Sequence, residues 1–526
     1  MLRQDIETAI KQAISRLKEF SSIPPFLSYA EKEKTKGYGD YSSSICFEMA
    51  KILKESPKDI AETLKQELIN SKEGKEMFER VEVINGFLNF FLKSDYLSKN
   101  LKHVLKEKDK FGNDKTGKGI KIQVEFISAN PTGPLTIGNA RGGFYGDVLC
   151  NVLEKAGFKT ERAYYINDYG MQILSLGHSI LKDSEAKYKG EYIDKLKERI
   201  KEKDPYKAGK RGAEIIMNEM IKKTVKNMGI HFDEWFKESE LYKSKRIDKA
   251  LELLEKKGLI YQKEGALFFK STEFRDERDR VAVKSNKEKT YLMGDISYHR
   301  YKFEEKKFNK VINIWGADHF GDIKGLMSGV EALGHKGKLK IVILQHVTLI
   351  ENGEIKKMSK REGVYVTVDE LLEEVGIDVS RFFFLQKSPE SHLNFDLSLA
   401  KEQSEKNPVF YVQYAYARIC SVLRKAKKKG LFLNFNKLVH PSELNLMKQI
   451  LRFEEIVKDT VIDYGVQRIP QYALDLASSF HQFYADCKVI NDDKELEKQR
   501  LGLVNAAKIV IKNTLQLMGI SSPETM

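Results

Sequence analysis

The sequence predicts an α/β protein in which a parallel-sheet domain lies between an α+β domain and an all-α domain. A strand, a loop, a helix and a second strand follow one another between Ile120 and Ile166, which is the pattern of a βαβ unit and hence of a parallel sheet. A hairpin pattern precedes this unit. Beyond Phe395 the strand signals fade, while helical periodicity continues to the end of the chain.

The first predicted domain spans residues 1–112. Ser56 and Pro57 form a helix start, because proline suits the first helical position. Two strand patterns, 81–84 and 87–91, flank Asn85-Gly86, a dipeptide that favours a hairpin turn. A polar stretch with several glycines (106–119) then marks the boundary.

The second predicted domain spans residues 113–395. Its first strand covers 120–126, a Pro/Gly loop follows, a helix runs from about Asn139 to Lys155, and the next strand covers 160–166. The β-branched stretches 310–315 and 340–345 are expected to add strands to the same sheet. The charged, mainly helical segment 183–274 is expected to be an insertion.

The third predicted domain, residues 396–526, is all helical. Apolar residues recur there at helical spacing, for example Ile419, Val422 and Leu423. The simplest interpretation of such a stripe is the core of a helical bundle.

Composition narrows the class of protein. The 526 residues include 90 Lys and Arg against 76 Asp and Glu, so the net charge is 90 − 76 = +14, which favours a polyanionic partner such as nucleic acid. A lysine-rich surface without a specific partner, as in many thermophiles, is the alternative.

No apolar run reaches the roughly 18 residues of a membrane span. The N-terminus lacks the apolar core of a secretory signal, and the four cysteines form no CxxC pair, so a reducing cytoplasm and no bound metal are expected.

Two loops carry the residue types of phosphate chemistry. The loop from Ser128 to Asn139 joins the end of a strand to the start of a helix, where open α/β sheets bind ligands and where helix N–H groups attract phosphate. The second loop, Glu354 to Gly363, contains four cations in six residues, Lys356, Lys357, Lys360 and Arg361. It is either a solvated charge run or a clamp that neutralises a departing pyrophosphate.

Together these loops resemble the class I aminoacyl-tRNA synthetases. Residues 130–141 stand where that family has its HIGH motif, and Lys357-Met358-Ser359-Lys360 reproduces its KMSKS-type motif. Further segments resemble arginyl-tRNA synthetase specifically, in the right order and over the whole chain. They are EFISANPTGPLTIGNARGG (125–143), YYIND (164–168), TYLMGDISYH (290–299), WGADH (315–319) and NPVFYVQYAYARI (407–419).

The resemblance implies a Rossmann-like catalytic domain, an N-terminal domain that contacts tRNA and a helical anticodon-binding domain. It also implies an arginine site with Glu125 and Asp295 on the guanidinium, Tyr291 lining the pocket, and Asn130 and His319 at the amino-acid end. A planar five-donor fork needs carboxylates of this kind, and the ammonium of lysine would leave part of the fork unpaired. Each residue also has a plainer interpretation: an exposed strand residue for Glu125, a helix N-cap for Asp295 and a structural histidine for His319.

The implied reaction has two steps and needs ATP with Mg²⁺. The carboxylate of L-arginine attacks the α-phosphorus of ATP, and the terminal 2′-hydroxyl of tRNA(Arg) then attacks the resulting mixed anhydride. Lys357 and Lys360 would stabilise the departing pyrophosphate, and no side-chain nucleophile is required. The expected ATP contacts are Pro131, Gly133, Thr136, Gly138, Asn139, Met358, Ser359 and Lys360.

One departure from the family pattern concerns the HIGH element. Arginyl enzymes mostly carry histidine at its first position, whereas this chain has Thr136 there and Asn139 at the fourth. Both can hydrogen-bond phosphate, but neither carries a protonatable ring, so a charge-assisted bond worth about 1 kcal/mol beyond a neutral one is lost. We therefore expect activation to depend weakly on pH between about 6 and 7, where histidine titrates.

The resemblance also implies tRNA contacts at both ends of the chain. Phe87 and Asn89 match positions that read a base of the D-loop, although Phe87 could equally be strand core. The helix with Tyr411, Gln413, Tyr414 and Arg418 resembles the anticodon-binding face, and some of its aromatic residues must be core. The net charge is expected to concentrate on the tRNA-facing side, near residues 356–361 and Arg424 to Lys429.

Two rival hypotheses remain at this point. A class I synthetase for cysteine or glutamine is disfavoured by the missing zinc ligands and by the Glu125–Asp295 pair. A catalytically weakened tRNA-binding paralogue is suggested by Thr136 and Asn139 and opposed by the intact lysine pair. The family further implies a monomer that activates arginine only with tRNA bound.

Overall fold

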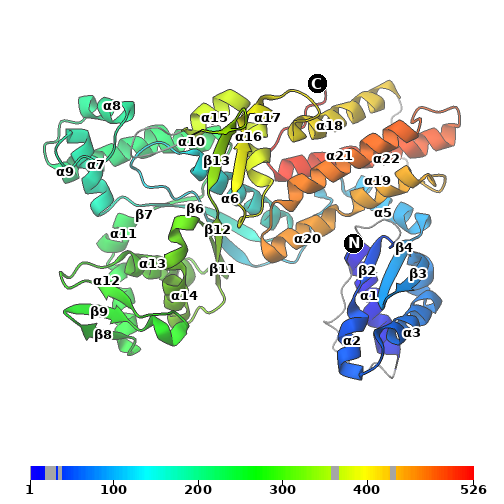
Figure 1. Cartoon of the computed structure of the whole chain (residues 1–526), viewed down its shortest axis with the longest axis horizontal. Helices are drawn as coiled ribbons and strands as arrows, with labels where there is room; N and C mark the ends of the chain where they lie inside the picture. The colour runs from blue at the N-terminus through cyan, green and yellow to red at the C-terminus, as the bar shows by residue number, and fades with distance from the viewer. Residues whose placement is uncertain (1, 18–30, 33–37, 357–365, 427–433) are drawn as a thin grey trace.

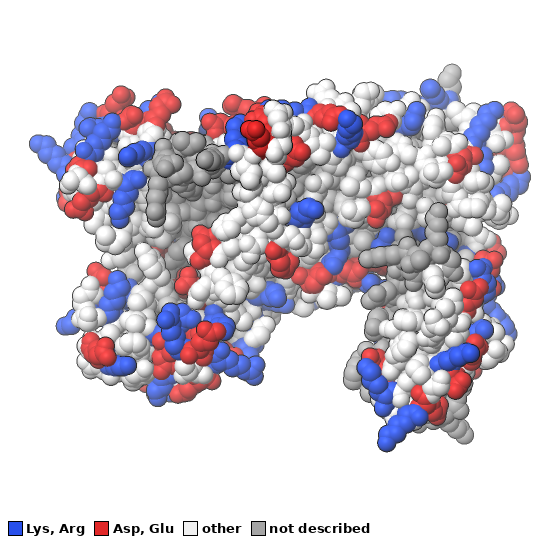
Figure 2. All heavy atoms as spheres, in the orientation of Figure 1, with Lys and Arg blue, Asp and Glu red and all other residues white. Residues whose placement is uncertain are grey.

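The computed structural model describes residues 2–17, 31–32, 38–356, 366–426 and 434–526. The N-terminal region (blue in Figure 1) and the lobe of α11–α14 (green) project from the same side of the molecule. Figure 2 shows that the surface is hollowed between these projections, and that basic and acidic side chains are interspersed on this face. The charge concentration expected near 356–361 and 424–429 falls mostly outside the described residues.

The N-terminal region packs helices on an antiparallel sheet of order β1-β2-β4-β3. The hairpin prediction is confirmed: β3 (Phe78–Ile84) and β4 (Phe87–Leu92) meet at Asn85 and Gly86, whose φ angles of 51° and 85° suit a type I′ turn. The other elements are α1 (Leu2–Arg16), β1 (Glu31–Lys32), β2 (Tyr41–Ser43), α2 (Ile45–Leu53), α3 (Pro57–Asn70), α4 (Lys72–Met77) and α5 (Ser94–Glu107).

The central sheet is parallel throughout and has the order β12-β11-β5-β6-β7. Its strands are β5 (Lys121–Glu125), β6 (Lys159–Ile166), β7 (Glu234–Lys237), β11 (Lys310–Gly316) and β12 (Leu339–Leu344), and α6 (Ile137–Lys155) follows β5. The chain runs outward from β5 on one side to β6 and β7, and on the other side to β11 and β12. The carboxyl ends of β5 and β11 therefore form the switch point where such sheets bind ligands.

The segment 183–274 is not wholly an insertion, because β7 belongs to the central sheet. This strand is short, Glu-Trp-Phe-Lys, and only Phe236 in it is buried, so it lacks the apolar run that marked the other strands. The helical elements before it are α7 (Met171–Leu181), α8 (Glu191–Arg199), α9 (Pro205–Ile215), the π-helical turn η4 (Ile216–Ile221) and α10 (Lys222–Asn227).

A second lobe, with its own hydrophobic cluster, follows β7. Its helices α12 to α14 pack beside an antiparallel sheet of order β10-β9-β8. Its elements are α11 (Glu238–Lys243), α12 (Arg246–Lys256), β8 (Ile260–Lys263), β9 (Ala266–Phe269), β10 (Arg280–Val283), α13 (Tyr291–Arg300), the π-helical turn η6 (Tyr301–Glu305), the 3₁₀ turn η7 (Ala317–Asp322) and α14 (Ile323–Ala332).

A small mixed sheet, β14-β13-β15, links the central sheet to the last region. The helical periodicity predicted beyond Phe395 is confirmed. These elements are β13 (Val347–Glu351), β14 (Glu354–Ile355), α15 (Val368–Val375), α16 (Ile377–Leu385), β15 (Leu393–Asp396), α17 (Leu397–Lys401), α18 (Pro408–Lys425), α19 (Pro441–Leu451), α20 (Phe453–Asp463), α21 (Arg468–Asp486) and α22 (Lys494–Leu517).

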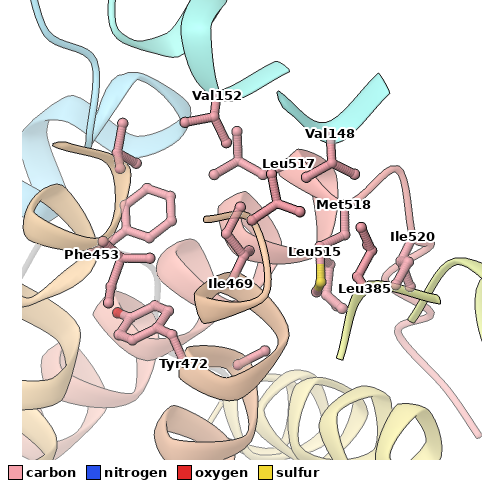
Figure 3. Close-up of a cluster of buried hydrophobic side chains, with 14 of the residues drawn as sticks. Val148, Val152, Leu385, Phe453, Ile469, Tyr472, Leu515, Leu517, Met518 and Ile520 are labelled. Carbon is pink, nitrogen blue, oxygen red and sulfur yellow. The ribbon is translucent and has the colours of Figure 1, made fainter. Parts of the chain in front are cut away.

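The helix α6, which follows the loop after β5, packs against the C-terminal region. Val148 and Val152 of α6 belong to one buried cluster with Leu515 and Met518 (Figure 3). Arg381 of α16 is buried in the same interface, where it donates to Asp147 of α6 (2.8 Å) and to the carbonyl of Met518 (3.0 Å). The helix α6 and the C-terminal helices therefore form one packed unit. Among the described residues no helix is long and apolar enough to span a membrane.

Candidate functional site

The loop after β5 begins with two residues in left-handed conformation, Ile127 (φ 64°) and Ser128 (φ 39°). Such a backbone is costly for residues other than glycine, so the surrounding contacts must hold it. The Ser128 hydroxyl provides one of them, since it accepts from the backbone N–H of Tyr165 in β6 (3.0 Å). The Tyr164 hydroxyl adds another by donating to the carbonyl of Ala129 (2.9 Å).

The start of α6 carries the predicted ATP contacts. Thr136 is the N-cap, and both its backbone N–H and its hydroxyl donate to Oδ1 of Asn139 (2.9 and 3.1 Å). With that oxygen occupied, Asn139 has its NH₂ group to offer a phosphate, next to the N-terminal N–H groups of the helix. Gly138 is exposed, a Cβ at Gly133 would crowd the Tyr192 hydroxyl at 3.2 Å, and Pro131 is buried.

The structure brings the two predicted loops together. Thr367, just after the lysine-rich loop, forms a β-bridge with Thr136, and the N–H of Val368 donates to the carbonyl of Leu135 (2.9 Å). The hairpin β13–β14 leads into the same loop from the other end. The predicted residues Lys357, Met358, Ser359 and Lys360 themselves lie outside the described residues.

The predicted guanidinium site is a cluster of acidic side chains, which we name the arginine pocket. Glu125 ends β5 and is buried, and Asp295 lies inside α13, which excludes the N-cap role because Thr290 occupies that position. Burial, followed by the nearby charges of Glu125 and Glu238, holds the pKa of Asp295 well above its usual range. A cationic ligand would reverse this effect, because it favours the ionised form of each carboxyl group.

Glu238 is a pocket residue that the sequence did not reveal. It opens α11, is buried, and has a pKa raised to about 7 by burial and then by the charge of Asp168. In the sequence it stands in the charged run Lys-Glu-Ser-Glu, where nothing distinguishes it from a solvated residue.

Lys302 was missed for the same reason. Its Nζ lies 2.5 Å from Oε2 of Glu125, and its side chain is fully buried. The sequence showed only a lysine in the charged stretch that follows the helix 291–300.

The other predicted arginine contacts are exposed side chains. Tyr291 is 62% exposed in the first turn of α13. His319 is exposed on η7, with Nδ1 3.6 Å from Asp322, one of the charges that raise the pKa of Asp295. Asn130 is exposed in the loop after β5.

A basic cleft of about 200 Å³ adjoins the same loop. Pro131 and Asp168 line it, together with residues of β7, α9, η4, α10 and α11. Four lysines line the cleft: Lys210, Lys222, Lys237 and Lys243. These lysines are far apart in the sequence, and no pattern there predicts that they gather in one place.

The two residues of the N-terminal region that were predicted to contact tRNA differ in solvent exposure. Phe87 is 41% exposed and its ring centroid lies 4.8 Å from that of Phe47, so it is available to a base. Asn89 is buried in the central strand β4, which is inconsistent with direct base reading in this conformation.

The predicted tRNA contacts on helix α18 also differ in solvent exposure. Tyr414 is exposed, Tyr411 is half-buried, and the Arg418 guanidinium lies 5.3 Å from the Tyr414 ring. Gln413 is buried and donates to Asp378 (2.9 Å) and to the Ser521 carbonyl (3.1 Å), so it holds the C-terminal tail and is not free to contact RNA. His481, whose ring contacts Tyr411 and Tyr414, and Tyr484, under Arg418, extend this face and were not predicted.

Models of known protein families match this chain over most of its length. Residues 4–92 match the arginyl tRNA synthetase N terminal domain, residues 100–202 and 182–396 match the catalytic domain of class I (R) tRNA synthetases, and residues 412–526 match the DALR anticodon binding domain.

Individual relatives agree with these matches. The arginine–tRNA ligase of Bacillus subtilis is 40% identical, with 100% of this chain and 98% of that protein covered. Arginine–tRNA ligase 1 of Halalkalibacterium halodurans is 41% identical, with 100% and 98% covered. The Thermus thermophilus arginyl-tRNA synthetase has the same fold, with a TM-score of 0.81 at 23% identity and 100% of both chains covered.

None of these matches supports the paralogue alternative or a synthetase for cysteine or glutamine. The chain belongs to the arginyl-tRNA synthetase family of class I aminoacyl-tRNA synthetases.

Proposed function

We propose that this chain ligates arginine to tRNA(Arg) in two steps at the switch point between β5 and β11. One observation supports this proposal most directly. An acidic cluster, a helix N-terminus and the end of a lysine-rich loop lie together at one edge of the sheet. The pocket suits the guanidinium, and the helix N-terminus suits the phosphates of ATP.

Arginine lies with its guanidinium between Glu125 and Asp295, and Tyr291 closes the side of the pocket. Two carboxylates on separate elements, β5 and α13, can each accept from a different edge of the planar fork. Asn130 and His319 contact the amino and carboxylate groups of the substrate. This arrangement presents the arginine carboxylate to the phosphates at α6.

ATP enters as its Mg²⁺ complex and binds along the loop from Pro131 to Asn139. The Asn139 amide and the first N–H groups of α6 donate to phosphate oxygens, and the exposed backbone at Gly138 lies under the adenine. Gly133 keeps the loop close to the neighbouring Tyr192. Magnesium usually keeps phosphate oxygens and water among its ligands, so it needs few protein oxygens here.

Lys357 and Lys360 neutralise the pyrophosphate as it leaves, and Met358 and Ser359 complete that loop. These four roles are based on the sequence motif alone. They are compatible with the bridge between Thr136 and Thr367, which holds the end of the loop beside the phosphate site. Positioning and charge stabilisation then account for the whole rate enhancement.

The tRNA contacts both ends of the chain. Phe87 stacks on a base beside the N-terminal region, and Tyr411, Tyr414 and Arg418 form the anticodon face. Asn89 and Gln413 support these surfaces from inside. The protein acts as a monomer.

Aminoacylation with radiolabelled arginine tests the assignment. We expect charging of total tRNA to be lost in the Asp295→Asn variant, and Tyr414→Ala to raise the KM for tRNA while leaving the KM for arginine unchanged. Pyrophosphate exchange should be negligible without tRNA and strong with it. Full charging by Asp295→Asn would contradict the pocket, and exchange without tRNA would contradict the requirement for tRNA.

A further inference from the structure

The most deeply buried charge pair of the arginine pocket involves a residue that contacts no substrate. Lys302 lies on η6, and its side chain is 0% exposed, while that of Glu125 is 8% exposed. Its ammonium group also lies 4.2 Å from the centre of the Tyr298 ring. A buried lysine of this kind is costly unless a partner compensates its desolvation, and Glu125 is that partner.

A chain of hydrogen bonds holds Lys302 in place. Lys302 donates to Oδ1 of Asn313 (3.4 Å), and Nδ2 of Asn313 donates to Nε2 of His299 (3.0 Å). The remaining ring nitrogen of His299, Nδ1, then donates to the backbone carbonyl of Asp295 (2.7 Å). Burial and then the Lys302 charge hold the pKa of His299 well below its usual range, which agrees with a neutral ring that accepts at Nε2.

This chain joins the two elements that carry the guanidinium carboxylates. Asn313 of β11 stands in register with Glu125 of β5, so the network starts at one carboxylate. It ends on the backbone of Asp295 in α13. The geometry of the two carboxylates therefore depends on buried groups that the substrate does not touch.

Both oxygens of Glu125 have protein partners. Oε2 pairs with Lys302, and Oε1 accepts from the Ser128 hydroxyl (3.3 Å). Each carboxylate oxygen has two acceptor sites, so one site on each remains for the guanidinium. Glu125 is thus fixed in orientation, and its charge is already balanced inside the protein.

We propose that Lys302 is a positioning residue for arginine recognition: it orients the Glu125 carboxylate and balances its charge, and leaves Asp295 and Glu238 as the carboxylates whose charge the guanidinium neutralises. The inference rests on the proposed role of Glu125. Without Lys302, three carboxyl groups would share the pocket with no internal cation, and the Glu125 carboxylate would lose the partner that holds Oε2 in place.

A double-mutant cycle tests the proposal in the full-length protein. Glu125→Gln, Lys302→Met and the double variant are assayed for aminoacylation, with KM for arginine, KM for ATP and kcat measured separately. We expect Lys302→Met to raise the KM for arginine about tenfold or more and to leave the KM for ATP unchanged. The double variant should be no worse than Glu125→Gln alone, because the lysine has nothing left to position.

Lys306→Met is the matched control. Lys306 also pairs with carboxylates, Glu161 at 3.2 Å and Glu234 at 3.4 Å, but it lies outside the pocket and is partly exposed. Its removal should leave the KM for arginine within twofold. An equal rise in this control would mean that loss of any carboxylate-paired lysine here disturbs the lobe, and it would overturn the proposal.

The remaining outcomes distinguish the role of Lys302 from the proposed role of Glu125. An unchanged KM for arginine in folded Lys302→Met, or additive effects in the double variant, would overturn the role of Lys302. An unchanged KM in Glu125→Gln would instead overturn the proposed role of Glu125. If Lys302→Met fails to fold by circular dichroism, Glu125→Gln and the double variant are compared directly, and a higher KM in the double variant contradicts the proposal.

Discussion

The arginine pocket and the phosphate loop lie at the same edge of the sheet but are built in opposite ways. The pocket consists of buried charges, Glu125, Glu238 and Lys302, with Asp295 half-buried beside them. The loop consists of neutral donors, backbone N–H groups and partly exposed side chains such as Thr136 and Asn139.

The difference follows from what each part must distinguish. A pocket that selects a guanidinium needs fixed charges in a dry environment, because there a wrong partner leaves groups unpaired. Phosphates carry their own charge and their own metal ion, so neutral donors and a helix N-terminus suffice. We therefore expect changes in the pocket to be large and specific for arginine, and changes in the loop to be smaller and specific for ATP.

The largest expected effect is that of Asp295→Asn. Removing one member of a buried charge pair costs about 2–5 kcal/mol, which corresponds to a roughly 30-fold to 5,000-fold loss in kcat/KM for arginine. Steady-state aminoacylation with varied arginine measures it, and Asp248→Asn, which removes a surface partner of Lys289, is the control. An effect on ATP of the same size would remove the distinction between the two parts of the site.

Next in size is the removal of the Thr136 hydroxyl. Thr136→Val keeps the volume and the backbone N–H donor but loses the hydroxyl, one of the two hydrogen bonds to Oδ1 of Asn139, so the NH₂ group of Asn139 is less firmly oriented. We expect kcat/KM for ATP to fall about tenfold, on the scale of one hydrogen bond to a charged group, with the KM for arginine unchanged. Thr136→Ser should retain most of the activity, and a change confined to arginine would contradict the assignment.

The third effect is the pH dependence of arginine binding. Glu238 has a pKa near 7 because of burial and Asp168, and Asp295, Tyr165, Tyr242 and Tyr291 surround the same space. An acid with a raised pKa is protonated below that pH, so the affinity for a cation rises as pH rises. We expect the Kd for arginine to fall about tenfold between pH 6 and 8 in calorimetry. Glu238→Gln should flatten this profile, and a flat profile in the unmodified protein would count against the role of Glu238.

The smallest effect concerns pH at the phosphate loop. Because Thr136 and Asn139 do not titrate, the KM for ATP should change less than about twofold between pH 6 and 7, where histidine would lose its proton. Thr136→His should introduce a dependence, with tighter ATP binding at the lower pH. A steep profile in the unmodified protein would show that some other titrating group contacts ATP.

The sequence was most informative where a local pattern fixes a local structure. The hairpin at Asn85-Gly86, the helix after the first loop and the strand at Ile120 all appeared close to their predicted bounds, since turn residues and periodicity act over short distances. β7 was missed because a four-residue strand at the edge of a sheet is recruited by its neighbour and not by its own composition.

By itself the sequence determined the architecture, the family resemblance and the chemistry required of two loops, because these depend on residue types at fixed spacing. Only the tertiary structure decided that Glu238 and Lys302 belong to the pocket, that four lysines line one cleft, and that Asn89 and Gln413 are buried. The physical reason is that charge, burial and pairing depend on groups far apart in the chain. The same lysine is a solvated residue or a buried counter-ion according to what the fold places beside it.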